Sequence, residues 1–275
     1  MEEKILILDF GSQYTQLIAR RIRELNIYCE IFPFNKIPEI TPEYVGVILS
    51  GSPFSVHDKD SPEINFETFG NLPVLGICYG AQLIAKENDC VVAKSEIREY
   101  GRAKLSYVNS ESLLMKDVEL DSDVWMSHGD SITEITESFQ VLASTKDVKV
   151  TSYYFKQKNY YGLQFHPEVT HTAFGRKILD NFTVKICGCS QSWNPKRFVE
   201  YTIEKIRNTV KDDKVVLGLS GGVDSSVAAM LIHKAIGKNL FCVFVDNGLL
   251  RKNEFSTVLS SYKNLGLNVI GVDAK

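Results

Sequence analysis

A cysteine framed by glycines is the first candidate for chemistry in this sequence. Cys78 lies within Leu75–Gln82, where a strand-like apolar run passes into a helical pattern. Gly76 and Gly80 permit the sharp strand-to-helix turn that exposes a nucleophile, and a helix N-terminus favours the thiolate form of a cysteine. Taken alone, a structural cysteine buried between two glycines would explain the segment equally well.

A histidine and a glutamate two residues apart form the second candidate. His166 and Glu168 follow a strand-like run in Gly162–Glu168. In an extended chain such residues point to the same side, so the carboxylate could fix the imidazole tautomer as the acid does in a Ser-His-Asp triad. A surface histidine beside a glutamate is common, but together with Cys78 the pair predicts a Cys-His-Glu triad.

Two more segments could complete such a site. Gly51, in Leu49–Pro53, follows another strand, and its backbone N–H could join that of Tyr79 in an oxyanion hole. An ordinary strand-to-loop turn is the alternative. Met126–Asp130 is interpreted as a compact polar turn whose backbone could hold a polar substrate, or as a simple loop.

A Ser/Gly loop between a strand and a helix lies in the last third of the chain, at Val215–Ser226. Its successive amides and hydroxyls could cradle a phosphate chain. The Gly-Lys-Ser/Thr of a Walker A loop is missing, which argues against a kinase or GTPase. Phe244–Arg251 follows the next strand and so lies at a strand carboxyl end, where α/β sheets bind ligands. An ordinary Asn-Gly turn after a strand is the alternative.

The elements around these motifs alternate as a mostly parallel α/β sheet requires. In the first part of the chain we expect strands at Lys4–Phe10, Tyr28–Phe32, Gly46–Ser50, Val74–Ile77, Ala103–Val108, Gln140–Ser144, Val150–Phe155 and Tyr161–Phe165, and helices at Ser12–Leu25, Gln82–Asn88 and Thr172–Ile186. In the second part we expect helices at Phe198–Thr209, Ser225–Ile236 and Glu254–Leu265 and strands at Lys214–Leu219, Leu240–Asp246 and Asn268–Val272. Because parallel sheets are normally covered on both faces, the second part is expected to be the beginning of a larger domain.

The length and composition of the chain agree with two domains and exclude some classes of protein. The chain has 275 residues and a net charge of -3, too small for a disordered polyelectrolyte or a dedicated nucleic-acid binder. Residues 1–189 carry a net charge of -7 and residues 190–275 one of +4. We therefore expect domains at 1–189 and 197–275, joined by a linker at 190–196. No apolar run approaches a membrane span and no signal-peptide pattern is present, so a cytoplasmic protein with six reduced cysteines is expected.

The first part resembles the class I, triad-type glutamine amidotransferases. Five segments match this family in order: Asp9–Tyr14, Ser50–Pro53, Gly76–Gly80, Ser127–Asp130 and Gln164–Glu168. The resemblance implies a flavodoxin-like, mostly parallel sheet. It also implies that Cys78 attacks the side-chain amide of glutamine, that His166 shuttles the proton and that Glu168 orients His166. The remaining implied roles are an oxyanion hole at Gly51 and Tyr79 and glutamine binding by Gln82, Ser127, His128 and Gly129. Ser52 stands where many relatives have glycine.

The second part resembles the N-type ATP pyrophosphatases, which implies a truncated α/β domain of the adenine nucleotide alpha hydrolase type. The implied ATP-binding residues are Ser220, Gly221, Gly222, Val223, Asp224, Ser225, Ser226 and Val245, with Asp224 on Mg²⁺. With Glu99–Ala103 and Asp246–Arg251, the two parts together resemble the family of glutamine-hydrolysing GMP synthases. This implies L-glutamine, ATP and XMP as substrates, no bound organic cofactor and no nucleic-acid or membrane partner. A homodimer through residues beyond 275 is also implied.

Other functions remain open on the sequence alone. A lone amidotransferase subunit would not explain Ser220–Ser226, whereas NAD synthetase, asparagine synthetase or a tRNA-thiolating enzyme would not explain the Cys-His-Glu set. A non-catalytic glutamine- or ATP-binding module is the alternative from a different class, and a glutaminase assay would discriminate it.

Overall fold

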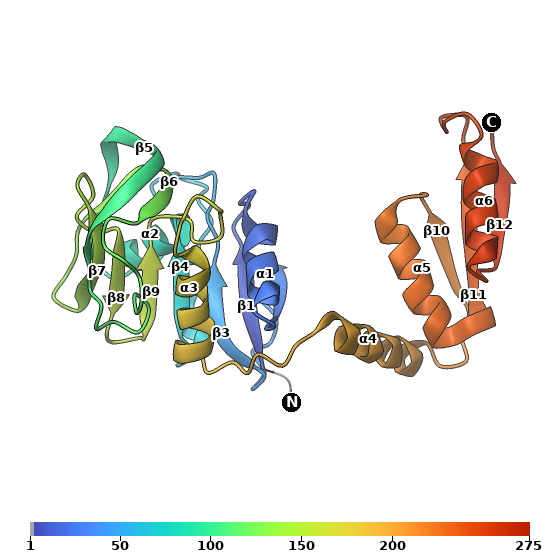
Figure 1. Cartoon of the computed structure of the whole chain (residues 1–275), viewed down its shortest axis with the longest axis horizontal. Helices are drawn as coiled ribbons and strands as arrows, with labels where there is room; N and C mark the ends of the chain where they lie inside the picture. Colours follow the sequence, from blue (N-terminus) through green and yellow to red (C-terminus); the bar gives the residue numbers. More distant parts are fainter. Residues whose placement is uncertain (1–2) are drawn as a thin grey trace. The chain divides into compact units, whose positions relative to one another are not determined.

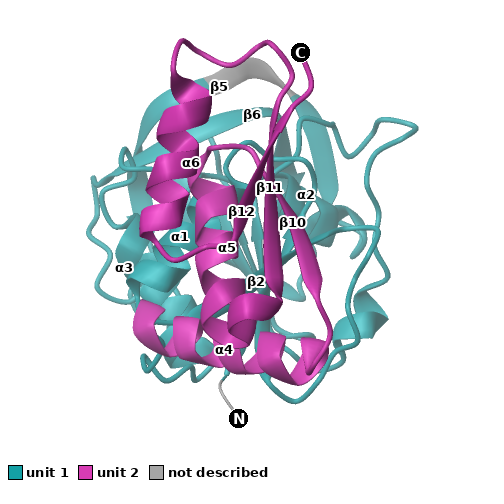
Figure 2. Cartoon of the chain, turned by 90° about the vertical axis from the view of Figure 1, so that its right-hand side faces the viewer, with its two compact units in different colours: residues 1–193 teal, residues 194–275 magenta. Residues whose placement is uncertain are grey.

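A computed structural model of the chain describes residues 3–275, except for the side chains of residues 95–99. The chain divides into two compact units, residues 1–193 and 194–275, which are coloured separately in Figure 2. Each unit contains one sheet. Within residues 3–275, no helix combines the length and apolar character needed to cross a bilayer.

The first unit is built on a nine-stranded sheet of order β2-β1-β3-β4-β9-β8-β7-β5-β6 (Figure 1). Its strands are β1 (Lys4–Asp9), β2 (Tyr28–Pro33), β3 (Tyr44–Leu49), β4 (Val74–Ile77), β5 (Val91–Val108), β6 (Asp123–Glu134), β7 (Phe139–Thr145), β8 (Ser152–Phe155) and β9 (Tyr160–Leu163). The five strands from β2 to β9 pair in parallel, and every pair from β9 to β6 is antiparallel. The predicted mostly parallel α/β fold is confirmed for β2 to β9, the strands that precede Cys78 and His166.

Helices cover both faces of the parallel strands. The helix α1 (Thr15–Glu24) and the short helix α3 (Gly175–Asp180) pack in one apolar cluster, and α2 (Tyr79–Lys86) packs in a second cluster on the other face. A 3-10 turn at Phe66–Phe69 joins the second cluster. Because both faces are covered, a strand such as β4 is apolar throughout and buried at every residue.

Several segments differ from the sequence prediction. The strand expected at Ala103–Val108 already begins at Val91, because β5 pairs along much of its length with β6. Met126–Asp130 is not a turn, because it lies within β6 and pairs with β5 across a register shift between Lys94 and Glu99. The predicted helix at Thr172–Ile186 begins only at Gly175 and changes to a π-helix at Asn181–Ile186. The Thr172 hydroxyl instead donates to the His166 carbonyl oxygen (2.6 Å) and accepts from the Trp125 amide (3.1 Å).

The second unit has a parallel three-stranded sheet of order β10-β11-β12. Its elements are α4 (Pro195–Val210), β10 (Val215–Leu219), α5 (Val223–Ile236), a 3-10 turn (Gly237–Asn239), β11 (Leu240–Asp246), α6 (Glu254–Asn264) and β12 (Val269–Asp273). The core combines one face of the sheet with α5 and α6, through residues such as Phe244, Ala229 and Tyr262. Asn194 caps α4 by accepting from the Arg197 amide.

Candidate active site

Cys78 lies at a strained turn between β4 and α2. It is the N-cap of α2 and has φ +52°, a left-handed conformation that is unfavourable for a residue with a Cβ. A Cβ on Gly76 would lie 2.5 Å from the Ala81 amide nitrogen, and one on Gly80 would lie 2.6 Å from the Cβ of Leu49. Only glycines fit at these two positions, so the local sequence permits the elbow that presents Cys78.

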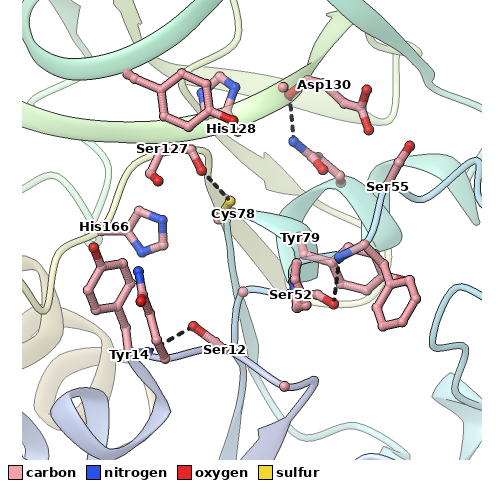
Figure 3. Close-up of a pocket in the computed structure, with 18 of the residues that line it drawn as sticks. Ser12, Tyr14, Ser52, Ser55, Cys78, Tyr79, Ser127, His128, Asp130 and His166 are labelled. Carbon is pink, nitrogen blue, oxygen red and sulfur yellow. Dashed lines mark hydrogen bonds between the residues drawn. The ribbon is translucent and has the colours of Figure 1, made fainter.

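His166 and Glu168 form a buried pair after β9. His166 Nδ1 lies 2.7 Å from Glu168 Oε1, and the two side chains are 4% and 0% exposed. The His166 amide donates to the Trp125 carbonyl oxygen (3.0 Å), which attaches this segment to β6. Figure 3 shows His166 on the same side of the pocket as Cys78. The structure therefore brings together the three residues predicted to form the triad.

The charge state of His166 follows from these neighbours. Burial alone would lower its pKa, but hydrogen bonds to Cys78 and Glu168, and the negative charges of both, raise the pKa of His166 to about 10. The imidazolium form of His166 is therefore stabilised at neutral pH, beside the Cys78 side chain. A cysteine acts as a nucleophile in its thiolate form, which a neighbouring imidazolium favours.

The two predicted oxyanion donors lie beside the sulfur-bearing residue. A Cβ on Gly51 would be 3.7 Å from the Cβ of Cys78 and 3.6 Å from Cε1 of His166, so Gly51 borders both residues. Tyr79 is the first residue of α2, and its amide is therefore among those that have no acceptor within the helix. The Gly80 amide donates to the Ser50 carbonyl oxygen (3.2 Å), which fixes this loop against the elbow.

A pocket of about 860 Å³ opens over Cys78 and contains all four residues predicted to bind glutamine: Gln82, Ser127, His128 and Gly129. The Gln82 side-chain amide donates to the Asp130 carbonyl oxygen (2.6 Å), so α2 and β6 are joined behind the sulfur. Cys78 Sγ lies 3.8 Å from the Ser127 carbonyl oxygen. Burial, and then the nearby charge of His166, lower the pKa of His128 to about 4, so His128 is neutral at pH 7.

The pocket also contains residues that the motifs did not assign to it. These are Gly11, Ser12, Gln13, Tyr14, Ser52, Pro53, Phe54, Ser55, Lys94, Tyr100 and Asp130. The family matches at Asp9–Tyr14 and Glu99–Ala103 could have pointed to Tyr14 and Tyr100. A sequence match, however, does not indicate what a side chain contacts. Sequence reasoning also missed Arg21 of α1, whose Nε donates to the Glu168 carbonyl oxygen (2.9 Å).

The predicted phosphate loop of the second unit connects β10 to α5. Gly222 is the N-cap of α5 and Gly221 has φ +78°. The Ser225 and Ser226 hydroxyls donate to the Gly222 carbonyl oxygen, at 3.0 and 2.7 Å. Asp224 is in the exposed first turn of the helix. Among the described residues, no group of three or more His, Cys, Asp or Glu could hold a metal ion, so Asp224 offers a single carboxylate.

Val245 belongs to β11, the strand that pairs with β10 and so lies next to this loop. It is the penultimate residue of β11 and is 44% exposed. Its neighbour Phe244 pairs with Leu219, the last residue of β10 before the loop. A Cβ on Gly221 would be 3.8 Å from the Phe244 ring, so the loop begins against this part of β11. The geometry places Ser220–Ser226 and Val245 at the carboxyl end of one sheet.

Comparisons with known proteins match both units. The family model for class-I glutamine amidotransferases matches residues 6–186, and the model for NAD synthase matches residues 196–275. A glutamine-hydrolyzing GMP synthase from Cytophaga hutchinsonii is 62% identical over the whole chain, and one from Phocaeicola vulgatus is 57% identical. The matches cover 54% and 53% of these proteins, so the chain spans about half the length of the curated relatives it matches.

A solved structure supports the assignment of the first unit. The crystal structure of a candidate GMP synthase subunit from Thermoplasma acidophilum has 30% sequence identity and a TM-score of 0.56. It covers 73% of this chain, and the match includes 98% of that protein. The family model spans the sheet, the elbow and the His-Glu pair, and on this evidence the chain belongs to the class-I glutamine amidotransferase family.

Proposed function

We propose that the first unit hydrolyses L-glutamine to glutamate and ammonia, with Cys78, His166 and Glu168 as its triad. The observation that carries this proposal is the strained elbow of Cys78 beside a buried His166–Glu168 pair of 2.7 Å, at the base of a pocket of about 860 Å³. A non-catalytic binding module would not require a positive-φ cysteine with an imidazolium beside it.

The chemistry follows in two halves. The Cys78 thiolate attacks the side-chain amide carbon, and the Gly51 and Tyr79 amides stabilise the resulting oxyanion. His166 donates its proton to the departing nitrogen, so ammonia leaves and a thioester remains. His166 then takes a proton from a water molecule that attacks the thioester, which releases glutamate and restores the thiolate. Glu168 holds the imidazole in one tautomer throughout.

The ammonia is the nitrogen donor for GMP synthesis in the longer protein. ATP adenylates the C2 oxygen of XMP, and ammonia displaces AMP to give GMP, AMP and pyrophosphate. Ser220–Ser226 and Val245 hold ATP, because the loop offers amides and hydroxyls at a helix N-terminus. Asp224 fits a Mg²⁺ ion shared with phosphates, because this ion needs only one or two protein carboxylates when phosphates supply the other ligands.

The same proposal includes the localisation, the oligomeric state and the cofactor requirement of the protein. De novo guanine nucleotide synthesis places it in the cytoplasm, where its six free cysteines stay reduced. The full-length protein is a homodimer that contacts its partner through residues beyond 275, and no organic cofactor is required. The near relatives named GMP synthase support this proposal over amidotransferases of other ATP pyrophosphatases.

The test compares glutaminase and synthase activities in the longer protein. Cys78→Ala should abolish glutamate release and glutamine-dependent GMP formation, yet retain GMP formation from added ammonia. Cys90→Ala, a buried cysteine that does not line the pocket, is the control and should retain all three activities. Glutamate release that survives Cys78→Ala would refute the triad. Loss of ammonia-dependent synthesis in a folded Cys78→Ala protein would refute the division of roles.

A further inference from the structure

The start of α1 lies against the segment that carries His166 and Glu168. Tyr14 is the N-cap of α1, and Arg21 follows it seven residues later, two helical turns along the same face. Tyr14 contacts the His166 ring, and Arg21 contacts the backbone of Glu168. One helix therefore contacts both members of the buried pair.

The Tyr14 ring lies against the imidazole ring of His166. The two ring centroids are 5.0 Å apart and the ring planes meet at 64°, an edge-to-face arrangement. Figure 3 shows the Tyr14 ring beside His166, on the pocket side. The His166–Glu168 hydrogen bond fixes one nitrogen of the imidazole, and a neighbouring ring limits the remaining rotation of its plane. The Tyr14 amide donates to Ser12 Oγ (3.1 Å), which fixes the backbone at this position.

Arg21 is hydrogen-bonded to the backbone of Glu168. Its Nε donates to the Glu168 carbonyl oxygen (2.9 Å), and its Nη1 lies 2.8 Å from Oε2 of Glu24, which holds the guanidinium in place. The Arg21 side chain is 23% exposed. Arg20, its neighbour, also pairs with Glu24 (3.0 Å), but its side chain is 73% exposed. Arg20 is therefore a matched control for Arg21. Both arginines pair with Glu24 on α1, but Arg20 is far more exposed.

We infer that Tyr14 and Arg21 are positioning residues for the acid–base pair, and that α1 holds the imidazole and the carboxylate in register with Cys78. This inference rests on the proposed glutaminase function. A displacement of about 1 Å in a catalytic group can cost on the order of 100-fold in rate. The two contacts therefore should affect the chemical step more than the binding of glutamine.

The experiment uses five variants of the full chain: Tyr14→Leu, Tyr14→Phe, Arg21→Met, Arg21→Lys and the control Arg20→Met. Each is measured for kcat and KM in glutamine hydrolysis and for thermal unfolding. The rate of Cys78 alkylation by iodoacetamide at pH 7 is followed by mass spectrometry. Alkylation reports the thiolate–imidazolium pair directly, without requiring turnover.

We expect Tyr14→Leu and Arg21→Met each to lower kcat about 10-fold while KM changes less than about 3-fold. The rate of Cys78 alkylation at pH 7 should fall about 3-fold or more, because a displaced imidazolium favours the thiolate less. Tyr14→Phe retains the ring and should behave as the parent, as should Arg20→Met. Arg21→Lys retains the charge but not the Nε donor, so it should resemble Arg21→Met.

The outcomes separate this inference from the proposed function. Parent-like kcat values and alkylation rates in both Tyr14→Leu and Arg21→Met would overturn the inference, as would an equal effect of Arg20→Met. A parent chain that releases no glutamate would refute the proposed function. In that case the rates of Cys78 alkylation still decide whether α1 positions the pair. If Tyr14→Leu or Arg21→Met unfolds at the assay temperature, Arg21→Lys supplies the test, because it removes the Nε donor to Glu168 and keeps the charge; a parent-like kcat in Arg21→Lys would then overturn the inference.

Discussion

The Cys78 amide donates a 2.7 Å hydrogen bond to the Leu163 carbonyl oxygen. Leu163 is the last residue of β9 and pairs with Ile77 of β4, the residue before Cys78. His166 follows only three residues later. The nucleophile and the base are therefore connected through the backbones of two adjacent parallel strands, and their separation depends on sheet register rather than on a flexible loop.

Cys78 should be alkylated well before the other five cysteines. Burial raises the pKa of Cys29 to about 11 and that of Cys189 to about 12, and it also raises the pKa values of Cys90, Cys187 and Cys242. At pH 7 these five thiols are almost entirely protonated, whereas Cys78 lies beside a cationic imidazole. Limiting iodoacetamide followed by peptide mass spectrometry should find most of the label on Cys78. Uniform labelling of all six would contradict the assignment of the elbow.

Glu168→Gln should lower the pKa of His166. Burial lowers the pKa of His166, and the hydrogen bond and charge of Glu168 are among the causes that raise it to about 10. Without them the effect of burial is larger, so the pKa should fall. Because the folded-state pKa is raised, protonated His166 stabilises the fold fully below about pH 6.5, and this contribution is lost as the pH rises through about 10. Imidazole NMR titration, assigned with His166→Gln, measures the shift. An unchanged His166 titration in Glu168→Gln would exclude this role for Glu168.

His128 should make the fold sensitive to acid. Its pKa is lowered to about 4 by burial and by the charge of His166, whereas an unfolded chain binds this proton near pH 6.5. The unfolded state therefore gains a proton first, and stability falls as the pH decreases from about 6.5 to 4, by roughly 3 kcal/mol at most. Urea unfolding at several pH values should show a weaker acid loss in His128→Asn. If the parent and His128→Asn lose the same stability in acid, groups other than His128 cause the loss.

Gly76→Ala should destabilise the first unit strongly. The added Cβ would lie 2.5 Å from the Ala81 amide nitrogen and 2.6 Å from the Gly80 carbonyl oxygen, which are backbone atoms of the elbow and helix α2. Relief requires a shift of the turn that carries Cys78, and we expect a cost of about 3 kcal/mol or more. Gly129→Ala is the comparison for stability, since nothing lies within 4 Å of its added Cβ. Urea midpoints that agree for the two variants would disprove the close packing at the elbow.

Asp224→Asn should weaken Mg·ATP binding in the longer protein without changing basal glutamine hydrolysis. An amide does not replace the charge of a carboxylate toward Mg²⁺. Asp213→Asn, an exposed aspartate between α4 and β10, is the control for a general loss of charge in the same unit. Calorimetry should show weaker Mg²⁺-dependent ATP binding for Asp224→Asn alone. Equal affinities for Asp224→Asn and the parent would remove Asp224 from the ATP site.

The sequence predicted the parts of the site that depend on local geometry. Gly76 and Gly80 indicated the elbow, and the two-residue spacing of His166 and Glu168 indicated that their side chains could meet. Contacts between distant segments were not predictable. The spacing of the motifs does not reveal that the Tyr14 ring lies against His166, 152 positions later in the chain, because this depends on how α1 packs on the sheet.

The segment Met126–Asp130 was misinterpreted for a different physical reason. Its serine, histidine, glycine and aspartate are typical of turns, and their strand conformation is imposed by pairing with β5. When pairing with a neighbouring strand imposes the strand conformation, the residue types of the segment do little to predict it. The second unit was easier to predict, because β10, β11 and β12 are apolar runs separated by clear helical patterns.

The insertion of β9 between β4 and β8 has a consequence for the order of folding. β4 and β9 pair in parallel although Val74 and Tyr160, which are register partners, are 86 positions apart in the chain. Such non-local pairing closes a long loop and is therefore slow compared with the formation of hairpins or helices. During synthesis Cys78 emerges early, with no imidazole beside it, and it remains an ordinary thiol until this late pairing brings His166 into place. Reactivity at Cys78 is thus a reporter for the pairing of β9 with β4 during folding.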